Sequence, residues 1–400
     1  MPARANVIRE VLARMERMGP DVLSLAGGMP GAHAYPHRFE AHLHQAFAGA
    51  AAPGAVMGYG DPRGHAPLRR AVADLAASWG MEMAQRELLI TTGGQQGLYL
   101  AARTLLKAGD TVVVPKPTYP GALQMFQLCG LTLQEAQTDE QGLLVDDALE
   151  QLLARGARCI YLIPDFDNPT GATLPEPRRQ RLLALAARFD AWVIEDLAYR
   201  ELRYDGIAPD LLSAACRGQE AQRVVTVASF SKSVMPSLRT GWVSAAPALI
   251  ERMTQHLQAL QLTGSPPLQA ALTAFLQDGY AEHLATVRAG YRQRRDALAD
   301  ALRRHFPQAR LQLPQGGFFV RQDLTPGVDE SAVFEYALEA ERVACIPGAG
   351  FSASGTPGGF LRLCFSTLDE PNLAEAVHRL ARAHDRVGGQ ALQQPTAVPA

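Results

Sequence analysis

The chain has 400 residues and a formal net charge of -2, from 38 Lys and Arg against 40 Asp and Glu. This length exceeds the roughly 250–300 residues at which a single core stops growing, so we expect two domains. The near-neutral charge provides no basic field for nucleic acid and no polybasic face for lipid, so neither partner is expected. No apolar stretch approaches the roughly 18 residues that a membrane helix needs.

Five cysteines are spread along the chain and never form a CxxC pair; they are Cys129, Cys159, Cys216, Cys345 and Cys364. Their odd number and wide spacing argue against a disulfide framework and against a zinc site. We therefore expect no metal. The first residues lack the apolar core of a signal peptide, which favours a cytoplasmic protein.

Apolar residues at helical spacing between Val7 and Met15 predict an amphipathic N-terminal helix. From about residue 65 to 250, short apolar runs alternate with amphipathic helical patterns. The predicted strands are 88–91, 111–114, 159–163, 191–194, 224–228 and 241–244. Strands that are apolar throughout and separated by helices are typical of a parallel sheet covered on both faces. We assign residues 41–284 to this large domain.

The pattern changes beyond residue 285. A long Arg- and Ala-rich helical stretch at 285–305 is followed by short strands at 318–320 and 360–363. We interpret residues 1–40 and 285–387 as one smaller α+β domain, built from the N-terminal segment and the C-terminal part. Residues 388–400 are low in complexity and predicted to be disordered. The fold class is α/β, with a mostly parallel central sheet in the large domain.

Polar motifs follow the predicted strands, and open α/β sheets bind their ligands beyond the carboxyl ends of the strands. Gly94 and Gln95 open a helix directly after a strand, where free backbone N–H groups can bind a phosphate. Tyr119 ends the following strand, where its ring can stack on a planar cofactor. Each feature alone also fits an ordinary turn or a packed loop residue.

Asn168, in the run N-P-T-G, follows the next strand and offers a rigid hydrogen-bonding amide, although N-P-T-G usually marks a simple turn. Asp196 lies where another apolar strand ends, so its buried carboxylate needs a cationic or hydrogen-bonding partner. A pyridinium nitrogen is such a partner, and Tyr199 can bond the phenolic oxygen of the same ring. The alternative makes Asp196 a helix N-cap or an ion-pair partner.

Lys232 follows the strand 224–228, with Ser229 and Ser231 before it and Arg239 after it. Its amine can form a Schiff base with an aldehyde cofactor, while the hydroxyls and the guanidinium can hold a phosphate. A solvated lysine in a turn is the alternative for this motif alone.

In this order, the motifs resemble the fold-type I pyridoxal phosphate (PLP)-dependent aminotransferases of class I/II over nearly the whole chain. The resemblance implies that PLP is the cofactor and that Lys232, Asp196 and Tyr199 are catalytic. It implies a cofactor site made of Gly94, Gln95, Tyr119, Asn168, Asp196, Tyr199, Ser229, Ser231, Lys232 and Arg239. Tyr59 resembles the tyrosine that reaches the partner subunit's phosphate, which implies a homodimer with shared active sites.

The resemblance also places substrate-binding residues. Arg362, in the run R-L-C-F-S, would hold the substrate's α-carboxylate together with Asn168. The run L-A-G-G-M-P at 25–30 and the pair Ile8-Arg9 resemble the kynurenine/α-aminoadipate aminotransferase branch, in which Gly28 and Arg9 would face the substrate. A surface helix arginine is the alternative for Arg9.

Two residues depart from the family's pattern. Lys116 stands where the family often has Glu, and Arg321 where a bulky apolar residue is common. Both positions leave the side-chain pocket, and therefore the substrate, open.

The implied function is transfer of an amino group between an L-amino acid and a 2-oxo acid through a PLP Schiff base on Lys232. We expect a 2-aminoadipate- or glutamate-like amino acid first and an aromatic one second. The alternative keeps fold and cofactor in a lyase, decarboxylase or cyclase of a biosynthetic pathway. A regulator with an aminotransferase-like effector domain is disfavoured because Arg9 already lies in the first helix of the expected fold.

Overall fold

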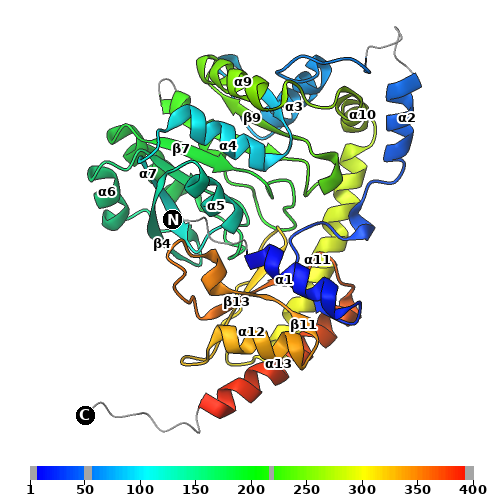
Figure 1. The fold of residues 1–400 in the computed structure, drawn as a ribbon, viewed down its shortest axis with the longest axis vertical. Helices are drawn as coiled ribbons and strands as arrows, with labels where there is room; N and C mark the ends of the chain where they lie inside the picture. Colours follow the sequence, from blue (N-terminus) through cyan, green and yellow to red (C-terminus); the bar gives the residue numbers. More distant parts are fainter. Residues whose placement is uncertain (1–6, 49–55, 216–219, 392–400) are drawn as a thin grey trace.

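The computed structural model describes residues 7–48, 56–215 and 220–391. Its main feature is an eight-stranded sheet in the upper half of the molecule (Figure 1). The strands are β2 (Glu87–Thr91), β3 (Thr111–Lys116), β4 (Thr132–Asp139), β5 (Gly142–Leu143), β6 (Cys159–Leu162), β7 (Trp192–Asp196), β8 (Val224–Ser229) and β9 (Gly241–Ala245), in the order β2-β9-β8-β7-β6-β3-β4-β5. Each pair of neighbours from β8 to β4 is parallel. Strand β9 pairs antiparallel with both β2 and β8, and β5 pairs antiparallel with β4. The predicted α/β fold with a mostly parallel sheet is confirmed.

Both faces of this sheet are buried, which explains why its strands are apolar throughout. Along β3, Val112 and Val114 pack into one hydrophobic core while Val113 packs into another. Helices supply the other half of each core. They are α2 (Phe39–Ala48), α3 (Ala66–Ser78), α4 (Gly94–Leu105), α5 (Pro120–Leu128), α6 (Asp147–Ala154), α7 (Glu176–Arg188), α8 (Leu212–Ala215), α9 (Pro247–Gln261) and α10 (Pro266–Gln277).

A smaller α+β part lies below the large sheet (Figure 1). Its antiparallel sheet has the order β10-β13-β12, from β10 (Phe319–Asp323), β12 (Ile346–Pro347) and β13 (Phe360–Cys364). Its helices are α1 (Val7–Met18), α11 (Tyr280–His305), α12 (Glu330–Glu339) and α13 (Glu370–Ala391). The N-terminal segment joins this part because β1 (Leu23–Ser24) pairs in parallel with β11 (Val343–Ala344).

Short 3-10 turns connect several of these elements; they are η1 (Ala32–Ala34), η2 (Met83–Gln85), η3 (Glu220–Arg223), η4 (Pro236–Leu238) and η5 (Gly348–Phe351). Strands β4 and β5 were not predicted. β4 lies near the sheet edge and alternates exposed with half-buried residues, so it lacks the continuous apolar run of the central strands.

The predicted disordered tail begins too early. Helix α13 continues to Ala391, so residues 388–391 are helical; the remaining predicted tail, 392–400, lies outside the described residues. The apolar face of α13, which includes Leu373, Val377 and Leu380, is buried, and this packing outweighs the low helix propensity of the Gly388-Gly389 pair. The domain limits proposed from sequence fall inside helices, at 40/41 in α2 and 284/285 in α11.

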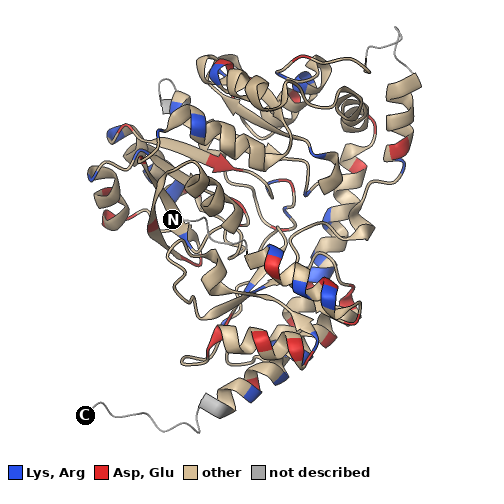
Figure 2. Cartoon of the chain, in the orientation of Figure 1, with Lys and Arg blue, Asp and Glu red and all other residues tan. Residues whose placement is uncertain are grey.

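Charged side chains of both signs are interspersed along the ribbon in the view of Figure 2. Within the described residues, no helix is both long and apolar enough to span a membrane.

Candidate active site

A cavity of about 580 Å³ lies at the carboxyl ends of the central strands, between the large sheet and the smaller part. Every site residue predicted from sequence lines this cavity except Tyr59. Those that do are Arg9, Gly28, Gly94, Gln95, Tyr119, Asn168, Asp196, Tyr199, Ser229, Ser231, Lys232, Arg239 and Arg362. The topology therefore brings together residues that are up to 353 positions apart, from Arg9 to Arg362 (362 − 9).

Lys232 lies just after β8, and its Nζ donates a hydrogen bond to the Gly28 carbonyl at 2.6 Å. Burial lowers the pKa of Lys232 to about 8, and the positive charges of Arg362 and Arg239 act in the same direction. A lysine in this environment is neutral much more often than a surface lysine near neutral pH, and a neutral amine is the form that acts as nucleophile or base.

Asp196 is the last residue of β7 and is buried. Its Oδ2 accepts a hydrogen bond from the Tyr161 hydroxyl at 3.0 Å, and its Oδ1 accepts from the Ala198 N–H at 3.1 Å. Burial nevertheless raises the pKa of Asp196 to about 6, because these neutral donors and the charge of Lys232 only partly offset the lost hydration. A cationic ligand nitrogen at this carboxylate would supply the missing charge.

Tyr161 was missed by the sequence analysis. It lies inside β6, where a tyrosine reads as one more buried strand residue, and no local motif marks its hydroxyl.

An anion cradle forms where the start of α4 meets Arg239. Gly93, with φ of +82°, precedes the helix, and Arg239 adopts a left-handed conformation with φ of 45°. Arg239 Nη2 donates to the Thr92 carbonyl at 3.0 Å, and a Cβ on Gly93 would lie only 2.7 Å from that same nitrogen. The free N–H groups of the helix start and the guanidinium thus converge on one point, as phosphate binding requires.

Hydroxyl groups and a ring complete the cofactor side of the cavity. Ser229 Oγ donates to Ser231 Oγ at 2.9 Å, beside the cradle. The Tyr119 ring packs so closely over Gly121 that a Cβ there would lie 2.4 Å from the ring. Gln95 Nε2 donates to the Gly121 carbonyl at 2.8 Å, which ties the start of α4 to this loop.

Arg362, in the middle of β13, is fully buried and lines the same cavity from the smaller part. Its Nη1 donates to Asn168 Oδ1 at 3.3 Å, and its Nη2 donates to the carbonyls of Ala26 and Gly27. Its Nε has no hydrogen-bond partner within the described residues. A buried guanidinium with an unmatched donor is suited to a carboxylate ligand.

Two aromatic rings flank this guanidinium, with centroids 4.4 Å (Phe319) and 5.3 Å (Phe351) from Arg362 Cζ. The missing side chain of Gly28 leaves open space beside the Arg362 guanidinium. A Cβ at this position would lie 3.4 Å from the Phe319 ring and 3.8 Å from Arg362 Nη1.

Arg9 lines the cavity together with Ile8 and Leu12 of α1 and is exposed. Tyr59 is 85% exposed and does not line this cavity. Lys116 and Arg321 are also absent from its lining: Lys116 pairs with Glu135 at 3.2 Å, and Arg321 pairs with Asp323 at 2.7 Å. Neither departure from the expected pattern alters the pocket directly.

These features fit PLP. The cradle at Gly93 and Arg239 has the hydrogen-bond donors for the PLP phosphate. Asp196 has a buried carboxylate whose charge its neighbours only partly compensate, and the PLP ring nitrogen can pair with it. Lys232 has the amine for its aldehyde, in the same cavity.

Comparison with known proteins agrees with this geometry. The family model described as aminotransferase class I and II matches residues 22–380. A 2-aminoadipate transaminase from Thermus thermophilus is 37% identical over 382 residues, which cover 95% of this chain and 94% of that protein.

Solved structures show the same likeness. A multiple substrate aminotransferase from Thermococcus profundus superposes with a TM-score of 0.91 at 32% identity, covering 98% of this chain and 97% of that one. The α-aminoadipate aminotransferase LysN from Thermus thermophilus, complexed with N-(5'-phosphopyridoxyl)-L-leucine, superposes with a TM-score of 0.87 at 34% identity, covering 97% and 96%.

Proposed function

Because the chain belongs to the class I and II aminotransferases, PLP-dependent enzymes that transfer amino groups, we propose that Lys232, Asp196 and Tyr199 carry its chemistry. The observation that carries the proposal is the half-buried Lys232, whose amine has a pKa lowered to about 8. It lies in one cavity with the Asp196 carboxylate and the anion cradle.

Bound PLP supplies an electron sink for the negative charge that develops at the substrate's Cα. Lys232, in its neutral form, would take the proton from Cα and, as general acid, deliver it to the carbon that was the cofactor's aldehyde carbon. With PLP bound, Asp196 would keep the ring nitrogen protonated, and the Tyr199 hydroxyl would donate to the ring's phenolic oxygen. These roles give each predicted catalytic residue one task.

The remaining cavity residues bind and orient. Gly94 N–H, Ser229, Ser231 and Arg239 would hold the phosphate and Tyr119 would stack on the ring, while Gln95 fixes the turn through its hydrogen bond to the Gly121 carbonyl. Arg362 and Asn168 hold the α-carboxylate, so the Cα–H bond is presented toward Lys232.

We propose L-2-aminoadipate or glutamate as the preferred amino acid. Arg9 supports this choice because it lines the same cavity as Gly28, and a guanidinium there can pair with a side-chain carboxylate. The 37% identity to a 2-aminoadipate transaminase supports it as well. The test is kcat/KM across acidic, aromatic and aliphatic amino acids; a preference for aromatic substrates that does not depend on Arg9 would overturn the assignment.

We further propose a homodimer with shared active sites. Large apolar residues are exposed on α2, before α3 and at the end of α9: Phe47, Met57, Tyr59, Leu260 and Leu262. Contacts between α2 and α10, and the closeness of Gly60 to Pro266, bring these segments toward one another. A second copy would cover them, with Tyr59 reaching the partner's phosphate. Sedimentation equilibrium tests the dimer; a monomer at micromolar concentration would contradict it.

The proposed partners are therefore small molecules and a second copy of the chain, with no nucleic acid and no membrane. We place the enzyme in the cytoplasm, because Cys129, Cys159, Cys345 and Cys364 are buried and free. Cell fractionation tests the location.

A further inference from the structure

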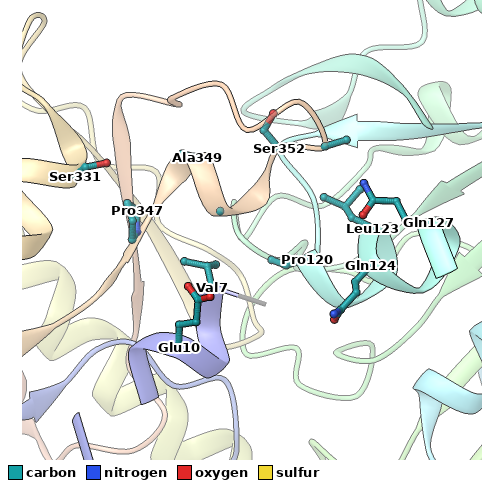
Figure 3. Close-up of a pocket in the computed structure, with 12 residues that line it drawn as sticks. Val7, Glu10, Pro120, Leu123, Gln124, Gln127, Ser331, Pro347, Ala349 and Ser352 are labelled. Carbon is teal, nitrogen blue, oxygen red and sulfur yellow. The ribbon is translucent and has the colours of Figure 1, made fainter. Parts of the chain in front are cut away.

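The segment 349–354 belongs to the smaller part and contacts the large part beside the active site. It includes most of η5 and lies next to the start of α5, and Figure 3 shows Ala349 and Ser352 of this segment around the same cavity as Pro120 and Leu123. With Val7 and Glu10 of α1, they enclose a second cavity of about 390 Å³. Gln124 lines both this cavity and the active-site cavity, so the segment lies next to the site.

Glu135 of β4 anchors the far end of this segment. Its Oε1 accepts hydrogen bonds from Ser352 Oγ at 2.8 Å, from the Ala353 N–H at 2.6 Å and from the Ser354 N–H at 3.2 Å. Its Oε2 accepts from Ser354 Oγ at 3.0 Å and pairs with Lys116 Nζ at 3.2 Å. One carboxylate of the large sheet therefore binds three consecutive residues of the smaller part.

Glu135 keeps its charge at this position. Its side chain is only 16% exposed, and burial alone would raise its pKa. The hydrogen bonds from Ser352 and Ser354, with Lys116 beside them, outweigh burial and hold the pKa of Glu135 below its usual value. Lys116, the departure from the family's pattern, thus acts as the cation of this anchor.

The near end of the segment is fixed from the smaller part. Glu330 of α12 is buried and accepts a hydrogen bond from the Ala349 N–H at 2.6 Å. Between the two anchors lies Phe351, whose carbonyl accepts a hydrogen bond from the Thr118 N–H at 2.9 Å. Phe351 is fully buried, and its ring is one of the two that flank the Arg362 guanidinium.

We propose that Glu135 is a positioning residue for Arg362, acting through Ser352–Ser354 and Phe351. This inference rests on the proposed role of Arg362 as holder of the α-carboxylate. A fixed segment keeps the Phe351 ring against the guanidinium, so Arg362 retains one orientation for its bidentate contact. Loosening the anchor lets Phe351 withdraw and leaves Arg362 misplaced. Glu135 touches no atom of the substrate or cofactor.

The test is Glu135→Gln in the PLP-loaded enzyme. We expect the KM values of the amino acid and the 2-oxo acid to rise together, by about tenfold, since both bind through an α-carboxylate. The dissociation constant of PLP should change less than about twofold, because Arg362 is not among the residues proposed to hold the cofactor. As a further control, the rate of reaction with the primary amine that corresponds to the amino-acid substrate without its α-carboxylate should be unchanged by Glu135→Gln.

Glu140→Gln is the matched control, because Glu140 lies just beyond β4 and pairs with Arg310 on the surface. The double variant Ser352→Ala/Ser354→Ala removes the two hydroxyl donors, keeps the two backbone N–H donors and keeps the carboxylate. It should raise both KM values in the same direction if Glu135→Gln fails to fold. Unchanged KM values in the double variant, or an equal loss for the amine without carboxylate, would overturn the proposal.

Arg362→Lys separates this inference from the proposed function. If it leaves both KM values unchanged, the role of Arg362 itself is wrong. If it raises them while the folded Glu135→Gln variant does not, only the role of Glu135 is wrong.

Discussion

The amine of Lys232, just after β8 of the large sheet, lies 2.6 Å from the carbonyl oxygen of Gly28 in the N-terminal segment. The same segment gives the carbonyls of Ala26 and Gly27 to Arg362 Nη2. Residues 26–28 therefore touch both the group proposed to move the proton and the group proposed to hold the substrate. Residues 26–28 thus link Lys232 to Arg362 through backbone hydrogen bonds.

Lys232 is expected to be the residue that binds PLP covalently. The chain contains only three lysines, Lys107, Lys116 and Lys232, so the assignment by mass spectrometry is direct. Borohydride trapping of PLP added to cofactor-free protein should label Lys232, with a pH midpoint near 8, where its amine loses its proton. Lys107 and Lys116 are the internal controls. A label on either, or a midpoint near that of free lysine at about 10.4, would contradict the account.

Lys232→Ala removes the proposed general base. The rate of amino transfer should fall by roughly 10²–10⁴-fold or more, since base catalysis of this kind contributes about that factor. The release of 2-oxo acid measures it. Lys107→Ala is the control and should retain most of the rate, because Lys107 is exposed and does not line the cavity.

Gly93→Ala is expected to weaken PLP binding by narrowing the anion cradle. Its Cβ would lie 2.7 Å from Arg239 Nη2, and Gly93 has φ of +82°. Gly109→Ala is a matched control, with φ of +92° and no atom within 4 Å of the added Cβ. Both variants carry the backbone strain, about 1 kcal/mol each, but only Gly93→Ala should raise the dissociation constant of PLP. Equal effects on PLP binding would point to strain alone.

Asp196→Asn should stabilise the cofactor-free protein while impairing its activity. The pKa of Asp196 is raised from 3.8 to about 6, so the folded state must bury a charge above pH 6. Below about pH 3 the carboxyl is protonated in both folded and unfolded chains, and the penalty disappears. The variant should gain roughly 1–3 kcal/mol in free energy of unfolding at pH 7.5 and less than about 1 kcal/mol at pH 4.

Denaturant titrations of the cofactor-free variant and wild type at these two pH values test the Asp196 prediction. Asp190→Asn serves as the control because its carboxylate is 64% exposed. A gain that is the same at both pH values would show that the buried charge is not its cause.

Arg9→Gln should lower kcat/KM for L-2-aminoadipate by at least about tenfold, because it removes the charge that pairs with the side-chain carboxylate. The value for leucine or phenylalanine should stay nearly unchanged. Arg17→Gln, on the exposed end of the same helix, is the control. An equal loss for all amino acids would assign Arg9 to the fold rather than to specificity.

Most of the site could be predicted from sequence because each motif follows its own strand, and parallel strands end at one edge of a sheet. Asp196, Lys232 and Gly94 are found in this way. Arg362 and Gly28 came only from the resemblance to the family, since they lie in the smaller part and no strand order predicts their closeness.

Tyr161 and Glu135 could not be predicted. The Tyr161 hydroxyl is placed by the register of β6 beside β7, and Glu135 acts on residues more than 200 positions away. The end of α13 was misjudged for a related reason: local composition at 388–391 favours a loop, but packing of the preceding turns carries the helix through.

The most direct test of the account is to mix the PLP-loaded protein with L-2-aminoadipate in the absence of any 2-oxo acid. We predict that one 2-oxoadipate is released per active site and that the reaction then stops, because the amino group remains bound to the protein until an acceptor is present. Adding 2-oxoglutarate should restart the reaction. Continuous turnover without an acceptor would contradict aminotransfer and favour a lyase, decarboxylase or cyclase on the same fold.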